Sequence, residues 1–339
     1  MRRQPTIRDV AESSGVSKST VSNVIRGADN VSPSTRRRVL DAVAQLGYRP
    51  NALARNLVRQ QTSTLGLVVG DLANPFYSEL AKLVEAHASE AGYTTMICNT
   101  DGRAASELAR VESLLEHRVA GILMLQFSGD GAIVSELLAQ GVPLVVVSCW
   151  EKRSDCVAVD DARAGELAVD HLLELGHRRI AYVSSALVEP ATDTARRRGY
   201  RRALTRAGLD SELALRLEHP AYLRSNSDLR VAVAAMLEQP VPPTAFFCSN
   251  DLVAVDLIET LEELGHAVPA AVSVIGFDDI ALAGLSRVGL TTIEQPREEL
   301  ARVGVALLRR RIERGAEPPP VRRKLQASLV VRASTAPPP

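Results

Sequence analysis

The sequence predicts two kinds of fold in one chain: an all-α helix-turn-helix head and an α/β body of two doubly wound parallel-sheet lobes. The first 50 residues hold three helix signals separated by glycines. From Leu65 onward, apolar runs such as LGLVVG and PLVVVSC alternate with helical patterns, as in parallel sheets covered on both faces. The charge is also uneven, because residues 1–60 hold 11 Lys and Arg against 4 Asp and Glu, while the remainder holds 29 against 36.

The composition indicates an ordinary globular protein of two or three domains, with 339 residues, 46% of them hydrophobic and 24% charged. We expect no membrane span, because no run of about 18 apolar residues occurs. The basic start MRRQPTIRDV lacks an apolar stretch behind it, so we expect a cytoplasmic protein rather than a secreted one. Its four cysteines have no CxxC spacing, which argues against a disulfide framework and a metal site.

The head contains the start and stop signals of three helices. Thr6 precedes the first helix, and Gly15 can end it in the left-handed conformation. Ser17 can cap a second helix that runs to about residue 26, and a third is framed by Ser32 and Gly47. Two helices joined by a short turn containing glycine follow the helix-turn-helix plan, in which the second helix enters the DNA major groove.

The outward face of the second helix carries small polar side chains and one lysine. Once its valines pack inward, Lys18, Ser19, Ser22 and Asn23 are left pointing outward. Hydroxyl groups and a helix N-terminus suit phosphate oxygens, whereas Lys and Asn suit base edges. A three-helix module for protein interaction is the alternative, but the charge excess of 11 − 4 = +7 argues against it.

A short amphipathic segment, RPNALARNL, links the head to the body. It could form little more than two helical turns, which are unstable alone in water. Something must therefore stabilise it, and a tether whose leucines touch the body is the alternative interpretation.

Polar and aromatic residues follow several of the expected strands in the body. Ligands bind at the carboxyl ends of strands in such folds. Each residue alone is more often a cap or a loop residue, but their shared placement favours a ligand site. The candidates are Phe76, Tyr77, Trp150, Asp160, Arg196, Asn250 and Asp278.

The segments TIRDVAESSGVSKSTVSNVIRG and VSPSTRRRVLDAVAQLGYRPNALARNL resemble the head and hinge of the lactose-repressor (LacI/GalR-type) family of bacterial transcription regulators. NPFY, CNTDG, SNDLVA and SVIGFDDI extend the resemblance over nearly the whole chain. It implies a body like the periplasmic sugar-binding proteins. It also implies that Lys18, Ser19 and Asn23 read bases, although many members carry Arg where this chain has Asn23.

The resemblance implies roles for further residues. Leu57 would wedge between base pairs in the central minor groove, with Ala54 nearby on the same face. The full expected DNA-binding set is Thr6, Ser17, Lys18, Ser19, Thr20, Ser22, Asn23, Ala54 and Leu57. The resemblance implies that six of the strand-end candidates contact the effector: Phe76, Tyr77, Asp160, Arg196, Asn250 and Asp278. Trp150 rests instead on its place at a strand end, from which it could stack on a sugar.

The resemblance also divides the chain. The expected parts are a head (1–50), a hinge helix and linker (51–62), a first lobe (63–161 with 291–321), a second lobe (162–290 with 322–333) and a disordered tail (334–339). Because no leucine heptads follow the body, we expect a homodimer rather than a tetramer.

The predicted function is that of a regulator, most simply a repressor, that binds a pseudo-palindromic operator in double-stranded DNA. A small molecule in the cleft between the lobes would control it: a sugar or sugar derivative, or alternatively a purine or other metabolite. The sequence contains no GxGxxG, P-loop, HExxH or GxSxG motif that would indicate an enzyme. We therefore expect no catalytic residue and no cofactor. A periplasmic-type solute-binding protein is the remote alternative, which the basic head disfavours.

Overall fold

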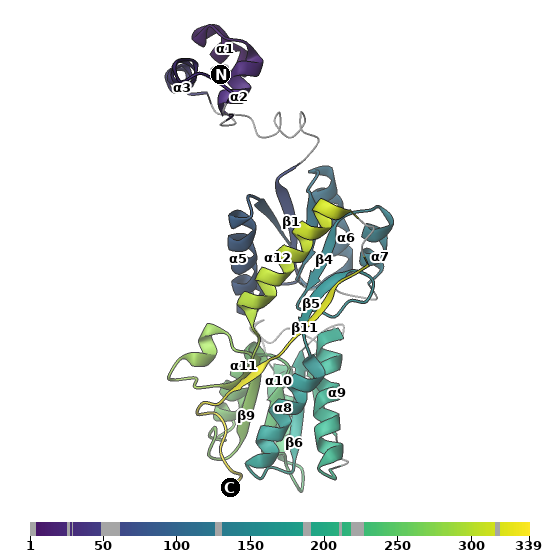
Figure 1. The fold of residues 1–339 in the computed structure, drawn as a ribbon. Coiled ribbons are helices and arrows are strands. Elements are labelled where there is room, and N and C mark those ends of the chain that lie inside the picture. The colour runs from purple at the N-terminus through teal and green to yellow at the C-terminus, as the bar shows by residue number, and fades with distance from the viewer. Residues whose placement is uncertain are drawn as a thin grey trace. The chain divides into compact units, whose positions relative to one another are not determined.

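The computed structural model divides into two compact units, Met1–Thr62 and Ser63–Pro339. It describes residues 5–25, 28, 30–48, 62–125, 131–185, 191–209, 212–217, 227–315 and 319–339. Figure 1 shows the elements of each unit. None of the helices in these ranges is both long and apolar enough to span a bilayer.

The first unit holds the three expected helices, α1 (Ile7–Ser14), α2 (Lys18–Ile25) and α3 (Pro33–Leu46). The glycines expected to end α1 and α3 both adopt the left-handed conformation, with φ of 65° and 62°. The three helices share one small apolar core, whose buried members are Val10, Ala11, Val21, Val24, Val39 and Ala42. Burying the apolar face of α2 in this core directs its polar face outward.

The second unit contains two six-stranded sheets, each with helices on both faces (Figure 1). Sheet A has the order β11-β5-β4-β3-β1-β2, and its strands run parallel. The strands are β1 (Thr64–Val69), β2 (Thr94–Asn99), β3 (Gly121–Met124), β4 (Leu144–Val147), β5 (Asp155–Val159) and β11 (Arg322–Leu325). Helices α5 (Pro75–Glu90) and α12 (Arg297–Arg314) cover one face, and α6 (Ala104–Glu116) and α7 (Ala132–Ala139) cover the other.

Sheet B has the order β12-β10-β9-β8-β6-β7, with only β12 antiparallel among the described strands. Its strands are β6 (Ile180–Ser185), β7 (Leu213–Leu217), β8 (Ala245–Cys248), β9 (Ser273–Asp278), β10 (Thr291–Glu294) and β12 (Ser328–Val330). Helices α8 (Asp161–Glu174) and α9 (Ala191–Arg206) cover one face, and α10 (Ser227–Leu237) and α11 (Asp251–Glu263) the other. A short 3₁₀ helix, η1 (Ala281–Gly284), follows β9. The predicted architecture of two doubly wound lobes is therefore confirmed.

The chain passes between the lobes at points that differ from two of the expected boundaries. β10, expected in the first lobe, instead pairs in parallel with β9 of sheet B. Residues 322–325, expected in the second lobe, form β11 and pair in parallel with β5 of sheet A. Strand pairing sets both corrections, so the last two crossovers fall at residues 295–296 and 326–327.

The expectation of a disordered tail at residues 334–339 is wrong, because this segment packs against sheet B. The Val274 amide donates to the Ser334 carbonyl at 2.8 Å, and the Ser334 hydroxyl donates back to the Val274 carbonyl at 2.6 Å. His177 Nε2 lies 2.9 Å from the carbonyl oxygen of Ala336. Residues 334–336, which precede the final prolines, thus attach this segment to sheet B.

Deleting residues 334–339 should lower the free energy of unfolding by about 3 kcal/mol, because several buried groups lose hydrogen bonds worth about 1 kcal/mol each. Deleting only residues 337–339 is the matched control, since it keeps the Ser334 and Ala336 contacts and should cost less than about 0.5 kcal/mol. Urea unfolding measures both changes. Identical curves for the two truncated chains would show that residues 334–336 contribute nothing.

Candidate DNA-binding surface and effector site

The start of α2 is built by hydroxyl groups that hold one another. Ser17 caps the helix, and its Oγ accepts from the Thr20 amide at 3.2 Å. The same oxygen lies 2.7 Å from Ser19 Oγ and 2.9 Å from Thr20 Oγ1. Ser17, Lys18 and Ser19 are exposed at this helix start. An exposed helix N-terminus carrying one lysine suits the oxygen atoms of a phosphate.

The other expected head contacts lie in less exposed places. Thr20, Ser22 and Asn23 are half-buried. Thr6 is also half-buried, and both its amide and its hydroxyl donate to Asp9 Oδ2, at 2.6 and 2.8 Å. This capping box gives Thr6 a structural role at the start of α1.

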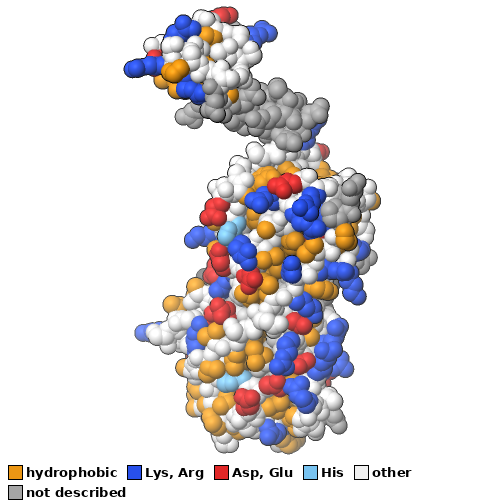
Figure 2. All heavy atoms as spheres, viewed as in Figure 1, with side chains coloured by type: hydrophobic (Ala, Val, Ile, Leu, Met, Phe, Trp, Pro, Cys, Tyr) orange, Lys and Arg blue, Asp and Glu red, His pale blue; other side chains and the backbone are white. Residues whose placement is uncertain are grey.

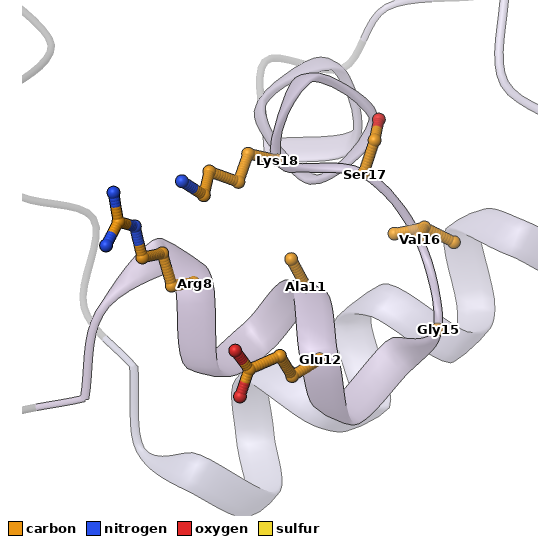
Figure 3. Close-up of a pocket in the computed structure, with 7 residues that line it drawn as sticks. All are labelled: Arg8, Ala11, Glu12, Gly15, Val16, Ser17 and Lys18. Atoms are coloured by element: carbon orange, nitrogen blue, oxygen red, sulfur yellow. The ribbon is translucent and has the colours of Figure 1, made fainter.

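A hollow between α1 and the start of α2 contains one basic residue that the sequence analysis missed. Figure 3 shows Arg8 and Lys18 pointing to the same side of this hollow, while Glu12 points away. The full lining is Arg8, Ala11, Glu12, Gly15, Val16, Ser17 and Lys18. Arg8 is an exposed residue of α1, and its position in the sequence does not show which residues of α2 it lies beside. Its place near Lys18 becomes clear only in the folded structure.

Ala54 and Leu57, the expected minor-groove residues, lie outside the described residues. Their roles stay predictions. Figure 2 shows mainly basic charged side chains on the visible face of the first unit, whereas the visible face of the second unit mixes basic and acidic ones.

In the body, a close helix pair positions the most important cation. Gly165 of α8 lies against the backbone of Arg196, and Gly199 of α9 lies against the carbonyl of Ala162. A Cβ at either glycine would collide with that backbone. The close approach brings Arg196 on α9 to Asp161, the first residue of α8.

Arg196 is buried at the centre of a polar cluster. Its Nε donates to Asp161 Oδ1 at 2.9 Å, and its Nη1 donates to the Ser249 carbonyl at 2.6 Å. Asp278 Oδ1 lies 3.9 Å from Nη1, and the guanidinium stacks 3.5 Å from the centre of the Phe277 ring. Two buried carboxylates and a ring therefore fix the orientation of this cation.

The first lobe contributes to the same cluster. Burial and the nearby Asp278 carboxylate raise the pKa of Tyr77, which also lies within electrostatic reach of Arg196 and Asp161. Its hydroxyl therefore stays protonated and can donate a hydrogen bond. Burial likewise raises the pKa of Cys149, just after β4, to about 12, with Asp161 again a neighbour. Residues that follow strands of both sheets thus lie within electrostatic reach of one another.

Gln295, which the sequence analysis missed, completes the cluster at the second crossover. Its Nε2 donates to Asp278 Oδ1 at 2.7 Å, and only 1% of the residue is exposed. Its buried Oε1 has no hydrogen-bond partner within the part of the chain that the structure describes. An unsatisfied buried acceptor is costly and indicates a place where a ligand group can donate.

Asp160 and Trp150 lie at the edge of the cluster and share one neighbour. Asp160 caps α8, accepting from the Arg163 amide at 3.3 Å, and pairs with Lys324 Nζ at 2.9 Å. The same Nζ lies 5.2 Å from the centre of the half-buried Trp150 ring. The hydrogen bond from Lys324 lowers the pKa of Asp160. Asp161, rather than Asp160, is therefore the carboxylate that faces Arg196.

Asn250 and Phe76 lie beside the cluster in structural positions. Asn250 Oδ1 accepts from the Val253 amide at 2.9 Å and so caps α11. Phe76 is 2% exposed and contacts Tyr77 edge to face, with ring centres 5.1 Å apart. Tyr77, Arg196 and Asp278 are thus the expected residues that the structure brings together most closely.

The two central carboxyls give this cluster a pH dependence. Burial raises the pKa of Asp161 and of Asp278 to about 6, although Arg196 acts in the opposite direction. Between about pH 4 and 6 the folded protein therefore binds more protons than the unfolded chain. Their contribution to the free energy of unfolding falls as the pH rises through this window and is constant above it.

Effector affinity should weaken by about tenfold between pH 7 and pH 5, because a ligand hydroxyl that donates to Asp161 or Asp278 requires the ionised carboxylate. Calorimetry in two buffers of different ionisation enthalpy would also detect a proton released on binding near pH 6. An affinity that does not change between pH 5 and 7 would remove these carboxylates from the ligand contacts.

Known families match both units of the chain. Residues 6–51 match the family "Bacterial regulatory proteins, lacI family", and residues 169–335 match "Periplasmic binding protein-like domain". Catabolite control protein A of Priestia megaterium is 36% identical, over 89% of this chain and 91% of its own. The ribose operon repressor of Escherichia coli K12 is also 36% identical, over 91% and 93%. The chain belongs to the lacI family.

Solved structures place this lacI-family chain among DNA-bound and sugar-bound relatives. The lac repressor dimer bound to operator and the anti-inducer ONPF aligns with a TM-score of 0.86 and 28% identity, covering 98% of this chain and 100% of that one. The transcriptional regulator CelR in complex with cellobiose aligns with a TM-score of 0.71 and 31% identity, covering 97% and 99%. The predicted fold class and the family resemblance are both confirmed.

Proposed function

We propose that this lacI-family regulator is a cytoplasmic, dimeric repressor whose head binds a pseudo-palindromic operator and whose body binds an uncharged sugar. The observation that carries the proposal is the buried cluster of Arg196, Asp161 and Asp278 in the second lobe, with Tyr77 of the first lobe within electrostatic reach of it. A ligand held there contacts both lobes at once. Its binding energy can therefore favour one arrangement of the lobes over another.

The charges of the cluster favour a neutral polyhydroxyl ligand. Arg196 already pairs with two carboxylates, so among the described residues of the cluster no unpaired cation is available for a phosphate or carboxylate group. Carboxylates accept hydrogen bonds from hydroxyl groups, and the Gln295 Oε1 can accept another. An anionic ligand would instead be repelled by the net negative charge of the site, and burial of its own charge would cost free energy.

A purine is the second candidate effector, and one relative supports it. The HTH-type transcriptional repressor PurR of Photobacterium profundum is 34% identical over 91% of this chain and 92% of its own. The half-buried Tyr77 ring, which packs edge to face against Phe76, would offer such a base an aromatic contact.

The head supports the proposed DNA contact through its charge and its exposed helix start. Lys18, which the resemblance assigns to a base edge, would instead bind a phosphate together with Arg8, because both side chains extend to the same side of the hollow beside the start of α2. Asn23 would contact a base edge. The minor-groove roles of Ala54 and Leu57 remain part of this proposal.

A thermal-shift panel on the full chain tests the effector class. D-ribose, cellobiose, ribose 5-phosphate and hypoxanthine would each be added at millimolar concentration, where a specific ligand raises the melting temperature by mass action. We expect stabilisation by a neutral sugar and none by the phosphate. Stabilisation by hypoxanthine or ribose 5-phosphate alone would contradict the sugar assignment.

A further inference from the structure

Arg297, the first residue of α12, makes contacts in both lobes. Its Nη1 donates to the carbonyl oxygens of Asp278 and Asp279, at 3.0 and 2.8 Å, where β9 of the second lobe ends. The same nitrogen lies 3.3 Å from Glu79 Oε2 on α5 of the first lobe. The Arg297 side chain is only 19% exposed, so solvent screens these contacts less than it screens a surface pair.

The two carbonyls belong to a strained part of the backbone. Asp278 has a φ of 115° and Asp279 a φ of 52°, in the region that favours glycine. Such conformations persist only where the surroundings hold them. Two hydrogen bonds from one guanidinium nitrogen, and the pairing of Asp279 with Arg332 at 2.7 Å, are among the contacts that hold this turn.

The strained turn and α5 both carry effector-site residues. The turn presents the Asp278 carboxylate to Arg196, and α5 carries Tyr77 two residues before Glu79. Arg297 therefore contacts the backbone behind one ligand residue and the helix that bears another. It lies behind the cluster, without a described bond to Arg196 or Tyr77.

We propose that Arg297 is a positioning residue that holds the Asp278–Asp279 turn and transmits its displacement, through Glu79, to α5 of the first lobe. The proposal rests on the proposed function, because it assigns the coupling of the same site. Loss of the guanidinium would leave the turn free to move without moving α5. The site would then keep its ligand groups but lose its mechanical link between the lobes.

Hydrogen exchange on the ligand-free full chain tests this link without any assumption about the effector. Asp278→Asn perturbs the turn, and the readout is amide exchange in residues 75–90 of α5. We expect Asp278→Asn to change α5 exchange by about threefold or more in the wild-type background, the size of a coupled contact. The same change should be absent in the Arg297→Gln background and partly retained with Arg297→Lys.

Two further variants keep the test decisive. Glu79→Gln should also abolish the transmitted change, because it removes the α5 partner. Arg302→Gln is the matched control on the same helix, since Arg302 is 58% exposed and pairs with Glu299 at 3.7 Å. No α5 response to Asp278→Asn, or an equal response with Gln at position 297, would overturn the proposal. A wrong effector class would leave all these outcomes unaffected.

Discussion

Arg196→Met is expected to abolish effector binding, with a loss of affinity of at least about 100-fold, and to lower the free energy of unfolding by about 3–5 kcal/mol. Removing the guanidinium leaves Asp161 and Asp278 buried without their cation, and it removes the hydrogen bond to the Ser249 carbonyl. Calorimetry with the sugar that stabilises the wild type measures the first effect, and urea unfolding measures the second.

The double variant Arg196→Met with Asp161→Asn should recover part of the lost stability, because one uncompensated charge is removed, but it should not recover binding. Arg202→Met is the control on the same helix, where a guanidinium 59% exposed lies 3.6 Å from Glu166. Its cost should stay below about 1 kcal/mol. Normal ligand binding by Arg196→Met would disprove the assigned site.

Lys18→Ala and Asn23→Ala should each weaken operator binding by about 10- to 100-fold while leaving the head folded, since neither side chain belongs to its buried core. The two variants should differ in kind. Loss of a phosphate contact at Lys18 should reduce the steepness of the plot of log binding constant against log salt concentration by about one. Loss of a base contact at Asn23 should instead weaken the preference for one base at one operator position.

Binding to operator sequences selected from random DNA, measured at several salt concentrations, separates these two effects. Ser13→Ala, at an exposed position near the end of α1, is the control and should leave affinity unchanged. Unchanged affinity, salt dependence and base preference in both variants would rule out the start of α2 as the DNA-reading surface.

The fold could be predicted from the sequence because its signals are local. Caps and glycines bounded the three head helices, and apolar runs marked most strands of the body. The edge strand β11 escaped prediction because its residues, Arg322–Leu325, are mostly exposed and charged and carry no apolar pattern. The tail escaped because a run of prolines suggests disorder, while the pairing of Ser334 depends on a distant strand edge.

The candidate site was predicted only in part, for a related reason. Asp160 and Asp161 have the same chemistry and adjacent positions, and the orientation of the start of α8 decides which one faces Arg196. Gln295 lies at a crossover, where no periodicity indicates the direction of a side chain. From the sequence alone Arg8 is an ordinary exposed helix residue, and only the folded structure shows that the start of α2 lies beside it.

The most direct test of the whole account is operator affinity of the full chain with and without the sugar that gives the largest thermal shift. We predict that a saturating amount of this sugar changes the dissociation constant for the operator by at least about fivefold, the lower range of allosteric coupling. The change should disappear in Arg196→Met, whose head is intact. The same dissociation constant with and without bound sugar would contradict the claim that the body controls the head.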